Sequence, residues 1–170
     1  MRSNLHLLSK LHFLSEKRRF ELFPPFFLMR VKVLELTDSW TRVRILLPLN
    51  WVSANAAGNM FGGYQASLAD PVPALACLRM FPGFRVATKK LEYDFVRVGN
   101  SNLVLHFDFN RQQAEAVRRE LAEHGRATPC FEMRYVRSDG KVCTFIRNTV
   151  AIRPQGYVAP HEHAEDKYEY

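Results

Sequence analysis

The sequence predicts an α+β protein in which a curved antiparallel sheet wraps around one long central helix. Several segments alternate apolar and polar residues, as strands with one buried face do. Between them, residues 60–80 are apolar and mostly free of charge, and a length of about 20 residues, or roughly 30 Å, favours a buried helix. Near the C-terminus, Asp139-Gly140 separates two alternating segments, which is a strong β-hairpin signal. Antiparallel strands around one apolar helix define the α+β class.

The same patterns predict the other elements. Residues 41–47 carry three apolar side chains on one face and two arginines on the other, which predicts a strand. Asn110 is a preferred N-cap and Gly125 a preferred C-terminal stop, so an inserted surface helix is predicted between them. The remaining predicted strands are residues 29–36, 86–98, 103–109, 131–137 and 142–152.

The chain suits one compact domain, because 170 residues of which 47% are hydrophobic can bury a real core. We expect this domain to span residues 23–155. A helical extension over residues 1–22 is expected before it, and a polar tail over residues 156–170 after it.

The extension is predicted to be helical because Leu7, Leu11 and Leu14 recur at helical spacing. A helix packed on its own domain is favoured over one lying on a membrane surface, since polar residues interrupt the apolar side. Pro24 and Pro25 are expected to end this helix.

Composition limits the partners. The net charge of +7 indicates an anionic partner without identifying it, and no nucleic-acid motif accompanies the charge. Cys77, Cys130 and Cys143 show no metal or disulfide spacing, which indicates free thiols in a reducing cytoplasm. His161 and His163 lack further ligands, so no metal is expected. No stretch is long and apolar enough to span a membrane.

Gly62 and Gly63 fall where the long helix should begin. The first turn of a helix has N–H groups without partners, and glycine lets a ligand approach them closely. The pattern suits an oxyanion or a polarised carbonyl oxygen, although two glycines also fit a simple turn.

Asp70 lies within this apolar segment, where a carboxylate needs a partner or has a raised pKa. It is therefore a candidate general base or nucleophile. Pro71 and Pro73 cannot bond the carbonyls of Ser67 and Ala69, so the helix is expected to open beside the carboxylate or to stop at Asp70.

Gly63 and Asp70 are separated by seven residues, or about 10 Å along a helix. One reacting carbonyl needs both its attacking group and its hydrogen-bond donors within roughly 3.5 Å. Two antiparallel copies of the helix would supply both groups, which predicts a site shared across a two-fold dimer interface.

Two segments of the sequence resemble those of a known family. The pattern N-x-x-G-x-x-F-G-G-x-x-x-S-L-A-D over residues 55–70 is similar to the signature of hotdog-fold acyl-coenzyme A thioesterases of the phenylacetate-pathway type. "VATKKLEYDFVRVG", at residues 86–99, resembles their next strand. The resemblance covers residues 23–154 and is strongest to a branch with "FGG…DP". It implies a hotdog fold and a homodimer or a tetramer built from two dimers.

The resemblance assigns roles to particular residues. Asp70 matches the catalytic carboxylate, Gly62 and Gly63 match the glycines that polarise the thioester carbonyl, and Asn55 matches an asparagine that positions substrate or water. Phe61 stands where the family usually has histidine, and a phenyl ring cannot replace the hydrogen bonds of an imidazole.

Substrate binding is expected around the same segment. Coenzyme A carries negative phosphates, which gives the positive charge a use. The expected substrate-binding residues are Phe61, Tyr64, Ser67, Lys89, Lys90 and Arg97, with Arg85, Arg147 and Arg153 as further cations. The expected acyl channel is lined by Tyr64, Leu68, Leu75 and Phe95. No cofactor is implied.

The leading hypothesis is therefore a thioester hydrolase. A non-catalytic module that binds acyl-coenzyme A or an acyl carrier is the alternative, and Phe61 in place of histidine favours it. Nucleic-acid binding rests on charge alone.

Overall fold

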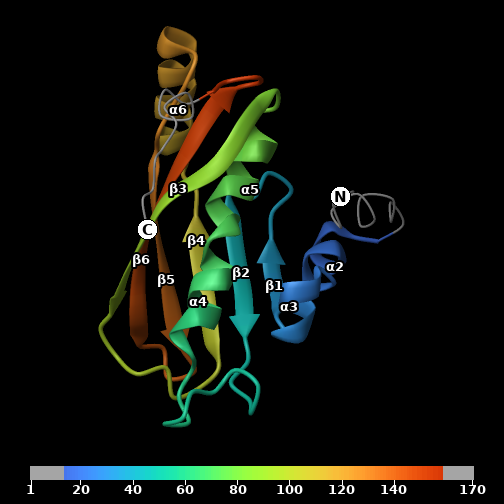
Figure 1. Ribbon diagram of the computed structural model, residues 1–170, viewed down its shortest axis with the longest axis vertical. Helices are drawn as coiled ribbons and strands as arrows, with labels where there is room; N and C mark the ends of the chain where they lie inside the picture. Colours follow the sequence, from blue (N-terminus) through green and yellow to red (C-terminus); the bar gives the residue numbers. More distant parts are fainter. Residues whose placement is uncertain (1–13, 159–170) are drawn as a thin grey trace, which may run out of the picture.

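The computed structural model describes residues 14–158 and has the α+β architecture that the sequence predicts (Figure 1). Six antiparallel strands form one sheet in the order β1-β2-β4-β5-β6-β3. The strands are β1 (Lys32–Leu36), β2 (Arg42–Leu47), β3 (Phe84–Phe95), β4 (Leu103–Asp108), β5 (Cys130–Arg137) and β6 (Val142–Pro154). The helices are α2 (Glu16–Glu21), α3 (Pro24–Leu28), α4 (Gly62–Ala69), α5 (Pro71–Met80) and α6 (Arg111–His124).

Strand alternation decides which face of the sheet is buried. In β2, Val43, Ile45 and Leu47 are at most 1% exposed, and Ile45 lies opposite Leu105 of β4. The last hairpin is confirmed as well, since Gly140 takes the positive φ of 78° that its turn requires.

The edge strand β3 contains a bulge that the sequence pattern concealed. Its pairing with β6 shifts register between Thr88 and Lys90. Before the bulge Phe84 and Val86 are half-buried, and after it the half-buried positions include Leu91. The extra residue changes the parity, so the apolar face stays on the core on both sides of the bulge.

The single central helix predicted for residues 60–80 is corrected to two consecutive helices, α4 and α5, which meet at Asp70. Asp70 keeps right-handed helical angles (φ −50°, ψ −55°). Pro71 and Pro73 have no N–H to offer the carbonyls of Ser67 and Ala69, so the hydrogen-bond ladder is interrupted there.

Both helices follow one path across the sheet (Figure 1). Their sheet-facing side chains, Leu68, Ala69, Val72, Ala76 and Cys77, are fully buried. The two helices therefore form one layer on one face of the sheet, and this layer positions the candidate site.

The N-terminal segment differs from expectation at the prolines. Helix α2 ends at Glu21, before Pro24 and Pro25, but these prolines begin a new helix, α3. Proline is well accommodated at the first positions of a helix, because the N–H groups there have no helical partner. The Glu21 carboxylate accepts a hydrogen bond from the N–H of Val33 at 2.9 Å, so α2 covers the outer edge of β1.

The inserted helix α6 is confirmed with both predicted ends. Asn110 caps it through a capping box with Gln113, and Gly125 ends it with a left-handed φ of 67°. Within residues 14–158, no helix has the length and apolar content needed to cross a bilayer.

Some expectations fall beyond the described chain. Leu7 and Leu11 of the predicted extension lie outside the described residues, as do His161 and His163. The domain limits remain predictions.

Candidate functional site

The site begins at the N-terminus of α4. Phe61 is the N-cap in extended conformation, and the N–H groups of Tyr64 and Gln65 donate to its carbonyl at 3.1 and 3.4 Å. Among the described residues, none accepts a hydrogen bond from the N–H of Gly62 or Gly63. Two adjacent main-chain donors at the positive end of the helix are therefore left without an acceptor in the described part of the chain.

The two glycines leave room for two different aromatic rings. A Cβ at Gly62 would lie 3.3 Å from Cζ of Phe95, which is tight. A Cβ at Gly63 would lie 2.4 Å from Cε1 of Phe61, which only a moved ring would allow. The Phe61 ring is 51% exposed and packs edge-to-face on Tyr64, with ring centroids 5.9 Å apart. Phe61 thus forms an apolar cover beside Gly63.

A cavity of about 590 Å³ opens at this end of α4. It brings together three of the predicted site residues, Asn55, Gly62 and Arg97. Its full lining is Asn55, Asn59, Met60, Gly62, Gln65, Phe95, Val96, Arg97, Val98 and Gly99.

Asn55 also stabilises the loop before the helix. Its Oδ1 accepts hydrogen bonds from the N–H groups of Ala57 at 2.9 Å and Asn59 at 3.1 Å. No described residue accepts a hydrogen bond from its Nδ2, so this amide group is the part of Asn55 that can still bind a substrate.

Asp70 lies at the other end of α4, away from the cavity lining. Its main-chain oxygen accepts hydrogen bonds from Asn148 Nδ2 at 2.9 Å and Thr88 Oγ1 at 3.1 Å. Its side chain is half-buried and has no hydrogen-bond or ion-pair partner within residues 14–158. Burial, and after it the negative charge of Asp70, raises the pKa of Tyr93. One copy of α4 therefore keeps the carboxylate and the open N–H groups at opposite ends.

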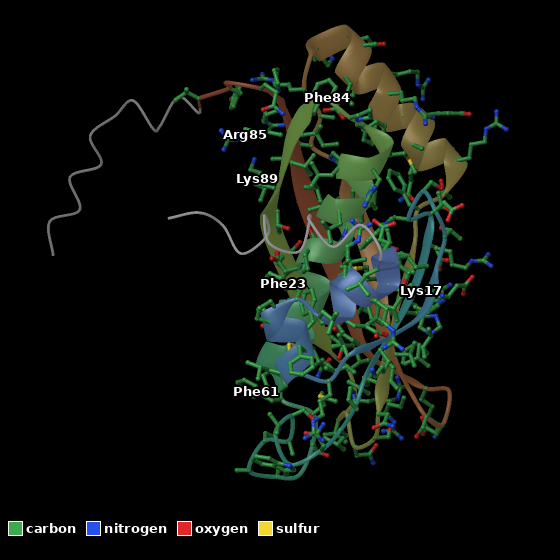
Figure 2. All side chains as sticks on the ribbon, turned by 90° about the vertical axis from the view of Figure 1, so that its right-hand side faces the viewer. Lys17, Phe23, Phe61, Phe84, Arg85 and Lys89 are labelled. Atoms are coloured by element: carbon green, nitrogen blue, oxygen red, sulfur yellow. The ribbon has the colours of Figure 1, made fainter. Side chains whose placement is uncertain are left out.

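The other predicted binding residues are distributed along β3 and α4. Lys90 forms an ion pair with Glu92 at 3.0 Å, and Lys89 points outward from β3 on the side where Phe61 also lies (Figure 2). The Ser67 hydroxyl donates to the carbonyl of Gly63 at 2.9 Å, so it is satisfied by its own helix. The Arg97 guanidinium donates to the carbonyl of Val142 at 2.9 Å.

The expected acyl channel is only partly formed. Leu68 is fully buried, Tyr64 and Leu75 are half-buried against the core, and Phe95 is 54% exposed at the cavity. In one copy of the chain these side chains do not all line one channel.

Sequence reasoning missed Gln65, a buried amide that lines the cavity between these residues. A glutamine in an apolar helix was the signal that could have found it, because a buried amide needs hydrogen-bond partners.

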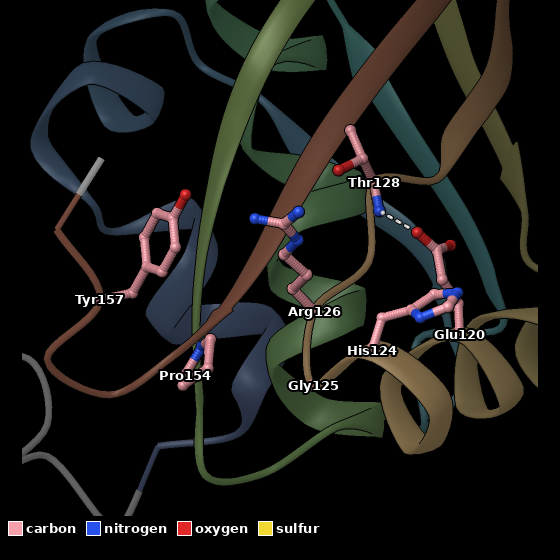
Figure 3. A pocket seen from close by; sticks show the side chains of 7 residues that line it. All are labelled: Glu120, His124, Gly125, Arg126, Thr128, Pro154 and Tyr157. Carbon is pink, nitrogen blue, oxygen red and sulfur yellow. Dashed lines mark hydrogen bonds between the residues drawn. The ribbon is translucent and has the colours of Figure 1, made fainter. Parts of the chain in front are cut away.

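A second cavity of about 650 Å³ lies at the opposite end of β3, between the end of α6 and the end of β6 (Figure 3). His124, Arg126 and Tyr157 contribute to its lining, and the N–H of Thr128 donates to Glu120 at 3.2 Å. None of the predicted catalytic or substrate-binding residues lines it.

An antiparallel sheet that packs on a central helical layer, with a helix N-terminus open at a cavity, is the hotdog architecture that the resemblance implies. Solved thioesterase structures share this fold. The chain is 18% identical to a probable thioesterase of unknown function from Pseudomonas aeruginosa, with 90% of this chain and 97% of that chain covered and a TM-score of 0.71. For a thioesterase from Haemophilus influenzae these values are 12%, 82%, 89% and 0.62.

A thioesterase from Staphylococcus aureus that carries a glutamine-to-alanine substitution is 15% identical, with 74% of this chain and 95% of that chain covered and a TM-score of 0.58. At these identities the likeness shows the fold. No protein-family model and no curated protein matches the sequence, and the "FGG…DP" branch remains a prediction.

Proposed function

We propose that the protein hydrolyses an acyl thioester at a site shared by two copies of the chain. The observation that carries the proposal is the arrangement of α4, which has open N–H groups on Gly62 and Gly63 at one end and Asp70 at the other. Both groups have the chemistry of thioester hydrolysis, but one helix keeps them too far apart to act on one carbonyl.

The two edges of the sheet support a dimer built through β3. The N–H of Val33 on the outer edge of β1 donates its hydrogen bond to the Glu21 carboxylate, and this contact blocks strand pairing there. No described residue pairs with the outer edge of β3, a strand of 12 residues. An open edge of this length is suited to pairing with a second copy. Antiparallel pairing about a two-fold axis reverses the direction of the second α4, so Asp70 of one copy approaches the glycine end of the other.

The spacing between Asn55 and Asp70 in the sequence provides further support. Solved variants of the Staphylococcus aureus thioesterase replace a glutamine and, 15 residues further along, a glutamate. Asn55 and Asp70 have the same separation in this chain and carry an amide and a carboxylate in the same order.

The reaction needs three things from the chain. The N–H groups of Gly62 and Gly63 stabilise the negative charge that develops on the carbonyl oxygen. As a base, Asp70 takes a proton from water, the water oxygen attacks the carbonyl carbon, and the C–S bond breaks to release a thiol and an acid. As a nucleophile, Asp70 attacks the carbon itself and the C–S bond breaks to expel the thiolate. Water then hydrolyses the resulting anhydride, and a proton from this water goes to the thiolate. Asn55 Nδ2 orients the substrate or the water.

Acyl-coenzyme A is the proposed substrate class. Lys89 and Arg85 are exposed on β3, and both point away from the ribbon on the same side (Figure 2). Such side chains can neutralise phosphate charge. A cytoplasmic location and further pairing of dimers into a tetramer belong to the same proposal.

One observation favours a second function, the binding of an acyl thioester without hydrolysis. The Phe61 ring occupies the space that a Cβ at Gly63 would take, where it adds apolar surface and no hydrogen bond. If catalysis were absent, the same open N–H groups would still hold a thioester carbonyl.

The test is thiol release from acetyl-, hexanoyl-, palmitoyl- and phenylacetyl-coenzyme A. Asp70→Asn should lower the rate at least about 100-fold, the scale expected for an acid/base group. Asp38→Asn is the matched control, because Asp38 is an exposed loop carboxylate far along the chain from the site. Equal rates for wild type and Asp70→Asn would remove Asp70 from the mechanism. Binding without turnover by the wild type would favour the binding module.

A mixing experiment tests the shared site. Gly62→Pro removes one open N–H, and proline suits the first helical position after an extended Phe61. When this inactive variant is mixed with inactive Asp70→Asn and the subunits exchange, half the dimers are mixed and each has one intact site. Activity should return to about a quarter of the wild-type value. No recovery despite verified subunit exchange would contradict a shared site.

A further inference from the structure

Gln65 is a polar side chain in an apolar layer, and its surroundings give it one orientation. It is 3% exposed at the fourth position of α4. The hydroxyl of Thr144, on β6, lies 2.7 Å from Gln65 Oε1. The hydroxyl of Tyr135, on β5, donates to the main-chain oxygen of Gln65 at 2.8 Å. Two strands of the sheet, β5 and β6, therefore fix this residue by hydrogen bonds on its sheet-facing side.

The hydrogen bond from Thr144 determines which end of the amide faces the cavity. Thr144 is fully buried and has one hydroxyl proton, with Gln65 Oε1 at 2.7 Å and Cys143 Sγ at 3.7 Å from its oxygen. Sulfur is the weaker acceptor, so the proton is donated to Oε1 and the amide oxygen is directed toward the sheet. The other end, the Nε2 group, has two N–H donors and finds no acceptor within residues 14–158. Three described side-chain atoms are both buried from solvent and without a hydrogen-bond partner: Arg19 Nε, Trp40 Nε1 and Asn148 Oδ1. Gln65 Nε2 is not one of them, so this group, unpartnered in the described chain, is accessible from the cavity side.

The free donors of Gln65 share their surroundings with the helix N-terminus. Gln65 and Gly62 are three residues apart, so they lie on one face of α4, and both line the cavity of about 590 Å³. The cavity thus receives the main-chain N–H donor of Gly62 at the helix end and an oriented amide donor one turn later.

We infer that Gln65 Nε2 donates a hydrogen bond to the thioester carbonyl oxygen beside the N–H of Gly62, and that Thr144 positions it. This inference rests on the proposed function and names a further residue of the same site. Charge grows on the carbonyl oxygen as the carbonyl carbon is attacked, so a donor held at this place by a buried hydroxyl stabilises the transition state. No proton is transferred by Gln65.

Two variants of Gln65 distinguish the loss of its hydrogen-bond donors from damage to the fold. Gln65→Glu keeps an oxygen for Thr144 and removes the amide donors, whereas Gln65→Met keeps the length and removes all hydrogen bonding. Both should lower kcat about 100- to 1,000-fold with little change in KM, the effect of losing one donor to an oxyanion. Gln112→Glu is the matched control, since Gln112 is exposed on α6. Thr144→Val should lower kcat as well, and Thr144→Ser, which keeps the hydroxyl, should restore it.

A binding measurement distinguishes this inference from the proposed function. Hexanoyl-coenzyme A is compared with its thioether analogue, which has CH₂ in place of the carbonyl, on wild type and Gln65→Met. Loss of the donor should weaken thioester binding at least about tenfold and leave thioether binding unchanged. This comparison needs no turnover, so it holds even if Asp70 proves not to be catalytic. Equal effects on both ligands, wild-type kcat in both Gln65 variants, or a failure of wild type to bind the thioester would overturn the inference.

Discussion

The contact between Phe61 and Gly63 leads to a sharp prediction about stability. Glycine within a helix costs about 0.5–1 kcal/mol relative to alanine, so Gly63→Ala should stabilise α4 where space allows. In the wild-type protein the new Cβ would lie 2.4 Å from Phe61 Cε1, whereas carbon atoms ordinarily stay about 3.5–4.0 Å apart. The ring must therefore swing away and lose its edge-to-face contact with Tyr64, which is worth about 0.5–1.5 kcal/mol.

The expected result is that Gly63→Ala changes stability differently with and without the Phe61 ring. In Phe61→Ala, adding Gly63→Ala should raise the free energy of unfolding by about 0.5–1 kcal/mol. In the wild-type background the lost contact should reduce or reverse this gain, which gives a coupling of about 0.5–1.5 kcal/mol. Urea unfolding at one fixed protein concentration measures all four proteins, because association would make stability depend on concentration.

The control cycle pairs Gly63→Ala with Phe95→Ala. The ring of Phe95 contacts the Cβ position of Gly62 and is not among the atoms nearest that of Gly63, so these two effects should add within about 0.5 kcal/mol. If Gly63→Ala were equally stabilising with and without Phe61, the ring would not cover Gly63.

Three further predictions follow from local structure. Asn110→Ala should lower the free energy of unfolding by about 1 kcal/mol in urea denaturation, because it removes the capping box of α6; an unchanged midpoint would contradict the cap. A maleimide should label exposed Cys130 in the folded protein and reach Cys77 only after unfolding, since burial raises the pKa of the Cys77 thiol to about 12. Burial, and then the charge of Arg44, lowers the pKa of His106 below 6.5 in the folded state. The unfolded chain therefore binds this proton more readily, and stability should fall as the pH drops below about 6.5; His106→Gln should lessen that fall in thermal melts.

The elements that were predicted correctly from the sequence are those that depend on local residues. The alternation of β2, the turn at Gly140 and the caps at Asn110 and Gly125 were all predicted, because each depends on neighbours within a few residues. The prediction of a single central helix was wrong, because the helix is interrupted at Asp70. The prolines that cause the interruption were identified from the sequence.

The candidate site was predicted less completely. The sequence pattern identified Asn55 and Gly62, which the structure brings to one cavity, and it recognised that Asp70 would lie too far from the glycines in one copy. It missed Gln65, whose role depends on Thr144, a residue 79 positions away in the sequence.

By itself, the sequence determined the class of fold, the succession of the six strands and the residue types at the helix terminus, because hydrophobic periodicity and capping are short-range properties of the chain. Only the tertiary structure decided which sheet edge is open, where β3 bulges, how Phe61 covers Gly63 and which end of the Gln65 amide faces the cavity. These features depend on which distant segments pack together, and a buried polar group takes its orientation from partners that no local pattern contains.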